Sequence, residues 1–173
     1  MKLTVVVGNP KSGSRTLMVA ETVAAKFRDV APDRELAIEV IDLARYVDGL
    51  LDWSSPKINQ LVESLLAADV SVVASPTYKA TYTGLLKVFL DRIAGGALVG
   101  QIAVPLMVAG APQHALAVET HLRPLLVELG ATCLTPGLCV LESELDQLDS
   151  VIEAWWASVF PVLTRLQAAR SVA

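Results

Sequence analysis

The chain has 173 residues, of which 53% are hydrophobic and 18% charged, and its formal net charge is −4. This composition excludes a disordered chain, and the scattered Lys and Arg residues form no basic patch that would indicate nucleic-acid binding. The longest apolar run, residues 102–112, is shorter than the roughly 20 residues of a membrane-spanning helix, which argues against a membrane protein. Two cysteines are too few for a disulfide framework, which predicts a cytoplasmic location.

In chain order, the first predicted strand is the apolar run at residues 3–8. A helix follows at residues 14–30, where apolar side chains recur at helical spacing. A second strand is predicted at residues 37–41 and a further helix at residues 57–67. Between them, residues 42–56 contain Gly, Ser and Pro and predict an irregular excursion rather than a domain boundary.

The alternation of strands and helices continues in the second half of the chain. Strands are predicted at residues 70–75 and 101–109, with a helix at residues 84–93 between them. A helix at residues 113–129 then precedes a fifth strand, which is expected within residues 131–140.

The last predicted element is a helix at residues 143–169. Ser143 is expected to cap its start within a cluster of acidic side chains, where negative charge is favourable. Trp155, Trp156 and Phe160 make this helix apolar around much of its circumference. We therefore expect it to bury itself against the sheet, a partner subunit or both.

The strand pattern predicts the fold. Strands one, three and four are nearly continuous apolar runs, which is typical of parallel strands covered on both faces. Strict alternation with right-handed crossovers then predicts a doubly wound sheet. The expected structure is α/β and flavodoxin-like, with three α/β/α layers, a five-stranded parallel sheet of order 2-1-3-4-5 and one domain over residues 1–173. Ligands of such folds bind beyond the carboxyl ends of strands one and three.

The loop after the first strand is the first candidate binding site. It lacks the G-x-G-x-x-G pattern of a dinucleotide-binding turn. Gly8 and Gly13 have the spacing of a P-loop, but Ser14 and Arg15 stand where that motif requires Lys followed by Ser or Thr. Without those groups, nucleotide hydrolysis loses its main electrostatic parts.

The polar groups of this loop suit a different ligand. Hydroxyl and amide groups, an arginine and the free N–H groups of the following helix can bind one terminal phosphate monoester without a metal. The groups concerned are those of Asn9, Ser12, Ser14, Arg15 and Thr16. The alternative interpretation is an ordinary loop with an N-capping serine.

Two further loops are expected at the same edge. Residues 75–84 offer hydroxyls, backbone donors and two aromatic side chains, Tyr78 and Tyr82, which could border a flat isoalloxazine ring. Residues 109–113 are mostly small and leave room for a planar ligand. Surface packing is the alternative role of the two tyrosines, but three complementary loops together favour FMN.

Other reactive residue types are expected to be bystanders. His114 and His121 lie seven residues apart, hence on one face of the predicted helix, and we expect packing or interface roles, with His121 the better placed to reach a neighbouring subunit. Cys133 and Cys139 lack the spacing of a redox pair or metal site and are expected to be buried thiols. No metal site is predicted.

The chain resembles the NADPH-dependent FMN reductase family, in particular the flavin reductases of two-component sulfonate monooxygenase systems. Residues 75–87 read SPTYKATYTGLLK and are similar to the family segment [ST]-P-x-Y-x-x-x-[YF]-[ST]-G-x-[LM]-K. Residues 8–16 are similar to its first loop, and residues 115–131 to the helix and turn after its fourth strand. The resemblance covers most of the chain to about residue 140.

The resemblance implies where the cofactor binds. The FMN phosphate would lie on the first loop and the ring against the second, with NADPH or NADH as the hydride donor. The implied cofactor-binding residues are Asn9, Lys11, Ser14, Arg15, Thr16, Pro76, Thr77, Tyr78, Lys79, Thr83 and Gly110. No catalytic side chain is expected, since hydride transfer from nicotinamide to flavin is the chemistry of the cofactors.

The resemblance also implies a dimer or tetramer that supplies reduced FMN to a monooxygenase. Some members of the family carry an aromatic insertion in the fourth helix, where this chain has Thr120 and His121, so the associated behaviour is not carried over. Two alternatives stay open from the sequence. One is an FMN-containing quinone, azo or metal-oxyanion reductase, and the other is a flavodoxin-like electron carrier without enzymatic activity.

Overall fold

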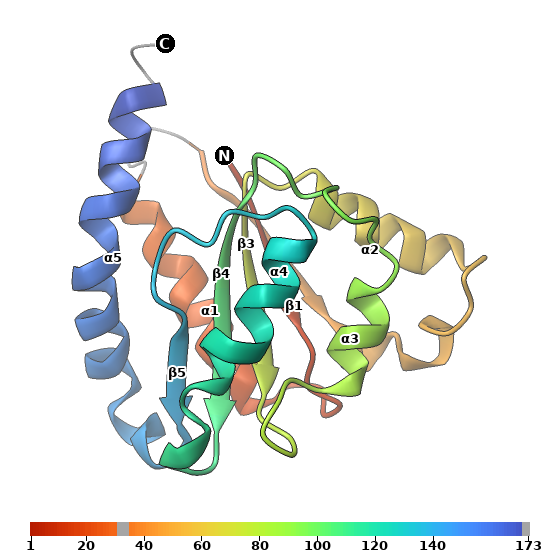
Figure 1. Ribbon diagram of the computed structural model, residues 1–173, viewed down its shortest axis with the longest axis horizontal. Coiled ribbons are helices and arrows are strands. Elements are labelled where there is room, and N and C mark those ends of the chain that lie inside the picture. The colour runs from red at the N-terminus through yellow and green to blue at the C-terminus, as the bar shows by residue number, and fades with distance from the viewer. Residues whose placement is uncertain (31–34, 171–173) are drawn as a thin grey trace.

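A parallel five-stranded sheet forms the centre of the computed structural model, which describes residues 1–30 and 35–170 (Figure 1). Its strands are β1 (Lys2–Val7), β2 (Ala37–Asp42), β3 (Val70–Pro76), β4 (Ile102–Ala109) and β5 (Leu138–Leu141). They are arranged in the order β2-β1-β3-β4-β5, and every adjacent pair is parallel. The predicted three-layer architecture and strand order are confirmed.

Helices cover both faces of this sheet. They are α1 (Arg15–Lys26), α2 (Pro56–Leu66), α3 (Gly84–Leu90), α4 (Arg123–Glu128) and α5 (Leu148–Arg170). One hydrophobic cluster joins α1 and α5 to one face of the sheet. A second cluster joins α2, α3, α4 and the residues just before α4 to the other face. Because neighbouring residues of a strand point to opposite faces, the central strands contribute alternately to the two clusters, which explains their continuous apolar runs.

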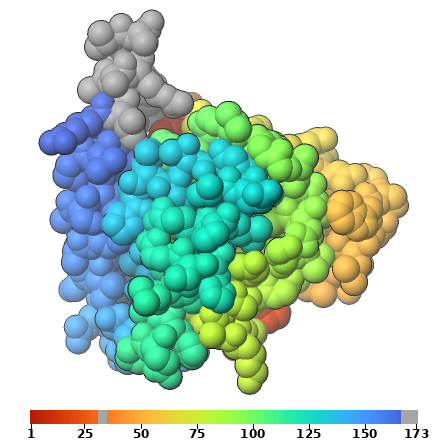
Figure 2. All heavy atoms as spheres, viewed as in Figure 1, coloured from red at the N-terminus to blue at the C-terminus, as the bar shows by residue number. Residues whose placement is uncertain are grey.

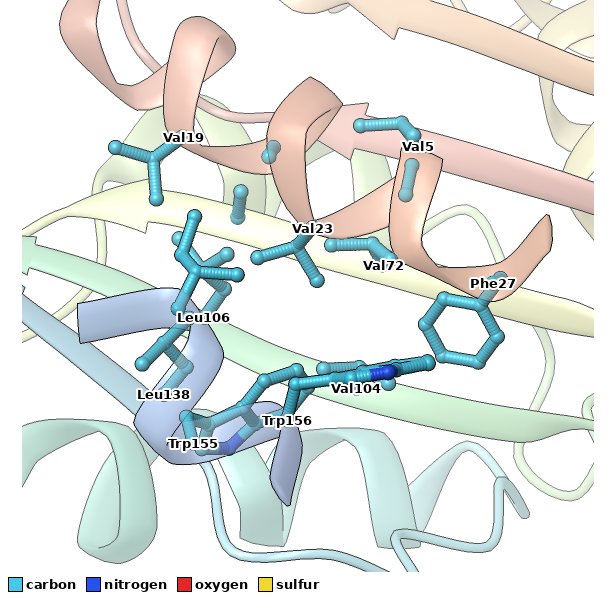
Figure 3. Packing of buried hydrophobic residues seen from close by; sticks show 14 of the residues in the cluster. Val5, Val19, Val23, Phe27, Val72, Val104, Leu106, Leu138, Trp155 and Trp156 are labelled. Atoms are coloured by element: carbon cyan, nitrogen blue, oxygen red, sulfur yellow. The ribbon is translucent and has the colours of Figure 1, made fainter. Parts of the chain in front are cut away.

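The terminal helix packs as expected, against the sheet and α1 (Figure 3). Trp155 and Trp156 are buried, and the Trp156 ring meets Phe27 edge to face at a centroid distance of 5.2 Å. The indole N–H of Trp155 donates to the carbonyl of Pro136 at 3.0 Å. Burying these large rings stabilises the fold chiefly through removal of apolar surface from water.

The start of this helix was predicted wrongly. Residues Glu142–Gln147 form a 3-10 turn before α5 begins, so Ser143 lies inside the turn and does not cap it. A side chain of the acidic cluster takes the capping role, because the carboxylate of Glu144 accepts the backbone N–H of Leu141 at 2.8 Å. The prediction of an acidic, capped start holds, but the capping residue differs.

The continuous helix predicted at residues 113–129 is also wrong. The chain forms a 3-10 turn at Pro112–His114 and a π-helical segment at Val118–Leu122 before α4. Pro124 has no N–H to donate, and the N–H of Arg123 reaches back five residues to the carbonyl of Val118. The seven-residue spacing of His114 and His121 therefore no longer places them on one face of a regular helix.

The π-helical segment is fastened to the loop before β5. The Arg123 guanidinium pairs with Glu119 and donates to the carbonyls of Cys133 (2.8 Å) and Thr135 (2.6 Å). The hydrogen bond from Arg123 lowers the pKa of Glu119, and a bond from the backbone N–H of Gly137 adds to this effect. The pair thus fixes the chain path into the edge strand.

The irregular excursion predicted at residues 42–56 is confirmed. It contains two 3-10 turns, Leu43–Arg45 and Val47–Gly49, and ends at α2. The Arg92 guanidinium holds the second half of this excursion. It donates to the carbonyls of Leu50, Asp52 and Trp53 and to the side-chain oxygen of Asn59 on α2. Among the helices of the described residues, none is long and apolar enough to cross a membrane.

Candidate functional site

Three loops leave the sheet side by side at its carboxyl edge, which faces the bottom of Figure 1. They are the β1 loop (residues 8–14), the β3 loop (residues 77–83) and the β4 loop (residues 110–117). The N–H of Gly8 donates to the carbonyl of Ala74, and that of Thr77 to the carbonyl of Val108, both at 2.8 Å. These bonds extend the sheet pairing, so the three loops begin beside one another, as the strand order predicts.

The β1 loop is held by its own polar side chains. Asn9 is buried; its Nδ2 donates to Thr16 Oγ1 at 3.0 Å, and its Oδ1 accepts the N–H of Lys11 at 2.9 Å. Ser14 caps α1 by accepting the N–H of Leu17 at 3.2 Å. Capping uses a lone pair of the serine oxygen and leaves its O–H as a donor, so the capping and phosphate-binding interpretations of Ser14 are compatible.

The cationic side chains of this region are exposed. The side chain of Arg15 is 59% exposed and pairs with Glu142, with 2.8 Å between Nη2 and Oε1. Lys11 is exposed at the tip of the loop. Both lie beside the N-terminus of α1, whose first N–H groups and dipole favour an anion. The acidic residue Glu142, from the other end of the chain, was not expected to reach Arg15.

A second unexpected contribution comes from the loop after β2. Asp42 is 3% exposed, and its Oδ2 accepts from the Ser12 hydroxyl at 2.9 Å and the Gly13 N–H at 3.4 Å. Arg45 lies 3.5 Å from the same oxygen through its Nε. The strand order was the available signal for these residues, because it places the end of β2 beside the end of β1. In the sequence they belong only to the predicted irregular excursion at residues 42–56.

The β3 loop makes a tight turn that projects from the lower edge of the surface, yellow-green in Figure 2. Tyr78 and Thr81 exchange both backbone hydrogen bonds, at 2.9 and 3.2 Å. The two residues between them, Lys79 and Ala80, have φ values of 51° and 66°. Neither is glycine, so each occupies a left-handed conformation at a cost of roughly 1–2 kcal/mol. The Tyr78 side chain is exposed.

Thr83 ties the β3 loop to the β1 loop. Its hydroxyl donates to the carbonyl of Gly8 and accepts the N–H of Leu86, which caps α3. Its own N–H donates to Ser75 Oγ at 3.0 Å. Gly8 lies so close to α3 that a Cβ there would overlap the Cβ of Leu86. The buried Thr83 therefore acts first as a clamp between two loops of the site.

Two features of this edge would accommodate a flavin ring. Thr77 Oγ1 is buried and has no hydrogen-bond partner within the described part of the chain, so it would gain a hydrogen bond from a ligand group that reached it. A Cβ built on Gly110 would meet no atom within 4 Å, so the space beside the β4 loop is open to a planar group. The residues present thus fit FMN, with phosphate donors on the β1 loop and room for the ring beside the other two.

Of the remaining candidates, His114 lies half-buried on the β4 loop, whereas the two cysteines and His121 lie outside the three loops. Cys133 and Cys139 are half-buried rather than fully buried, and burial raises the pKa of both thiols, which keeps them protonated and unreactive. His121 is exposed on the π-helical segment. Across residues 1–30 and 35–170, no group of three or more His, Cys, Asp or Glu side chains is arranged to hold a metal ion.

Comparison with known proteins identifies the family. A sequence model of the NADPH-dependent FMN reductase family matches residues 1–145. The FMN reductase (NADPH) of Escherichia coli (strain K12) is 28% identical over 179 residues, covering 92% of this chain and 90% of the relative. The NADH-dependent FMN reductase SfnF of Pseudomonas fluorescens (strain Pf0-1) is 29% identical, covering 83% of this chain and 78% of the relative.

A solved structure agrees with these relatives. The apo form of the NADH:FMN oxidoreductase EMOB is 31% identical and aligns with a TM-score of 0.75 over 91% of this chain and 89% of its own. The resemblance carried by residues 8–16 and 75–87 is thereby confirmed. The chain belongs to the NADPH-dependent FMN reductase family.

Proposed function

We propose that this protein is an NAD(P)H-dependent FMN reductase that supplies reduced FMN to a partner monooxygenase. The proposal rests on one arrangement of three loops. Phosphate donors lie on the β1 loop, while the β3 and β4 loops offer open space and a hydroxyl without a hydrogen-bond partner, and Thr83 joins the β3 loop to the β1 loop. FMN bound there would supply the ring that accepts hydride from the nicotinamide. Family membership supports the same activity.

The phosphate end is assigned to the start of α1. The O–H of Ser14, the exposed cations Lys11 and Arg15 and the first N–H groups of α1 would bind the phosphate. Asn9 and Thr16 contribute indirectly, because their mutual hydrogen bond fixes the loop shape that presents those groups. Thr83 holds the carbonyl of Gly8 and so sets the position of the loop relative to α3.

The ring end is assigned to the other two loops. Pro76 and Thr77 lead into the strained turn, and the unpartnered Thr77 hydroxyl would gain a hydrogen bond from a ring substituent. Tyr78 and Lys79 present their backbone and exposed side chains along the ring edge, and Gly110 leaves room opposite. The chain thus binds, orients and shields the reactants, and no side chain needs to donate or accept a proton during hydride transfer.

An acidic residue near the cationic loop favours FMN as an exchanging substrate over a permanent group. Glu142 already pairs with Arg15, so a phosphate must share this cation with a carboxylate. Such competition lowers affinity. Relatives are named for NADPH in one case and for NADH in another, so both donors are included in the proposal.

The setting of the enzyme is likewise proposed. We infer a single FMN-binding domain over residues 1–173 and a cytoplasmic homo-oligomer, either a dimer or a tetramer. Two apolar side chains are exposed, Leu116 on the β4 loop and Val127 on α4, and they support an apolar contact with another subunit. Relatives are named as FMN reductases, and this name supports a partner enzyme that consumes the reduced flavin.

Steady-state kinetics on the purified full chain test the activity. Oxidation of NADPH and NADH is followed while FMN is varied, and the filtrate is assayed for flavin. We expect saturable dependence on added FMN and release of the flavin. Failure to bind FMN, or to oxidise either nicotinamide in its presence, would refute the reductase. Retained FMN with ping-pong turnover onto a quinone would refute the supply of free reduced flavin.

The phosphate assignment has its own test. We expect Ser14→Ala and Arg15→Ala to weaken binding of FMN by roughly tenfold, because each removes a charge-assisted hydrogen bond. Riboflavin, which lacks the phosphate, should bind both variants nearly as well as the wild type. Titration of flavin fluorescence measures both ligands, and equal weakening of the two would remove the assignment.

A further inference from the structure

We propose that the loop after β2 completes the phosphate site, with Arg45 as a direct phosphate ligand and Asp42 as the residue that positions it. The inference rests on the proposed FMN-binding function. It adds a binding residue from a second loop, some 30 residues beyond the β1 loop in the sequence.

The register of the sheet brings the two loops together. β2 pairs with β1 in parallel, with Asp42 opposite Val7, so both strands end at the same level. Residues that follow Asp42 therefore lie beside residues that follow Val7. Arg45 closes the 3-10 turn Leu43–Arg45 immediately after β2, within reach of the β1 loop.

Asp42 binds two groups of the β1 loop. Its Oδ2 accepts the Ser12 hydroxyl at 2.9 Å and the Gly13 N–H at 3.4 Å, which fixes the turn that precedes Ser14. Its Oδ1 is buried without a hydrogen-bond partner in the described residues. A buried carboxylate of this kind requires a nearby cation, and Arg45 is the cation in contact, at 3.5 Å.

Arg45 is anchored at one end and exposed at the other. Its Nε lies 3.4 Å from Ser12 Oγ and 3.5 Å from Asp42 Oδ2, while 65% of its side chain is exposed. Within the described residues, the only hydrogen bond of its guanidinium is the one made by Nε. An arginine held through Nε with a free planar fork beside a helix N-terminus matches the geometry in which guanidinium groups bind phosphate.

The arrangement distributes roles between the two side chains. Asp42 neutralises part of the arginine charge and orients the fork, and the fork adds two donors to those of Ser14 and α1. The alternative role of Arg45 is purely structural, in which it only neutralises the buried carboxylate. The two roles differ in their effect on flavins with and without a phosphate.

Binding of FMN and riboflavin to Arg45→Ala separates these roles. We expect FMN to bind roughly tenfold more weakly, as for loss of a charge-assisted hydrogen bond, and riboflavin to change by less than about twofold. Arg45→Lys should recover part of the loss, since it restores the charge but not the fork. Arg28→Ala is the matched control, because Arg28 is an exposed arginine on the turn after α1, outside the site, and its removal changes the net charge equally.

The outcomes distinguish this inference from the function on which it rests. Unchanged FMN affinity in Arg45→Ala, or equal loss for FMN and riboflavin, would overturn the inference while the wild type still reduces FMN. Absence of FMN binding by the wild type would instead refute the proposed function.

The positioning role of Asp42 is tested by coupling. Asn at position 42 can still accept the Ser12 and Gly13 bonds but carries no charge to hold Arg45. We expect Asp42→Asn to reduce the preference for FMN over riboflavin when Arg45 is present, and not to reduce it in the Arg45→Ala background. An equal reduction in both backgrounds would show that Asp42 does not act through Arg45.

Discussion

The β1 and β3 loops border the same site but are stabilised in different ways. In the β1 loop, polar side chains satisfy one another and the backbone: Asn9 bonds Thr16, and Asp42 holds Ser12 and Gly13. In the β3 loop, the turn between Tyr78 and Thr81 is closed only by backbone bonds. It places two residues with side chains in left-handed conformations.

This difference corresponds to what each loop must recognise. A phosphate needs several donors held at fixed positions, and preorganised side chains provide them with little reorganisation on binding. A flat ring needs an edge and a few backbone groups, and a strained turn can supply these where the fold over-determines its conformation. The β1 loop is therefore expected to be sensitive to the loss of contacts, and the β3 loop to gain stability when its strain is relieved.

The largest expected effect is at the start of the β1 loop. Gly8→Ala would force a Cβ into the Cβ of Leu86, between two elements that cannot separate without breaking the bond from Thr83 to residue 8. We expect a loss of about 3 kcal/mol in the free energy of unfolding. Chemical denaturation measures it, and Gly84→Ala is the control, since a Cβ there meets no atom within 4 Å. Equal stability of the two variants would contradict the close approach.

Asn9→Ala tests the side-chain network of the same loop. The change removes the donor to Thr16 and the acceptor for the Lys11 N–H, both at a largely buried residue. We expect a loss of about 2 kcal/mol in unfolding free energy. Lys11→Ala changes a neighbouring side chain that is exposed, and should cost much less. A stability equal to that of the wild type would show that the loop does not depend on its side chains.

The opposite sign is expected in the β3 loop. Ala80→Gly removes the strain of a φ of 66°, which is offset in part by the greater chain entropy of glycine in the unfolded state. We expect a net stabilisation of about 0.5 kcal/mol, measured by denaturation. Ala67→Gly, at an exposed helix end with φ −83°, should be neutral or destabilising. Destabilisation of the Ala80→Gly variant would remove the contrast between the loops.

Much of the fold was predictable because it depends on patterns that one segment contains by itself. Strands β1, β3 and β4 are continuous apolar runs, and the alternation with helices leaves few topologies. The prediction of one helix at residues 113–129 was wrong because Pro124 interrupts the helical hydrogen bonding. This proline is a local signal against a continuous helix, but the prediction gave more weight to the spacing of apolar residues. The capping role of Glu144 in place of Ser143 depends on turn geometry that sequence spacing does not specify.

The site was predictable to the extent that its donors lie next to each other in the sequence. The hydroxyls and amide of the β1 loop are adjacent residues, and the structure brings them together as expected. Asp42, Arg45 and Glu142 are distant in sequence and join the loop only through the folded sheet. The left-handed turn at Lys79 and Ala80 was not predictable either, because neither residue type favours that conformation.

The smallest expected effect concerns the charge balance of the β1 loop. Glu142 pairs with Arg15 at 2.8 Å, and both side chains are substantially exposed, so the ion pair is weak and a phosphate can displace it. We expect Glu142→Gln to tighten FMN binding by roughly twofold, since the phosphate no longer competes with a carboxylate for the arginine. Riboflavin affinity should stay the same.

Asp146→Asn, which removes one exposed charge from the same turn, is the control for general electrostatics. Fluorescence titration at low salt measures the affinities of the wild type and both variants for FMN and for riboflavin. Weaker FMN binding by Glu142→Gln would instead mean that Glu142 orients Arg15 toward the phosphate, and the β1 loop would then depend on a fixed side chain for its cation as well as for its shape.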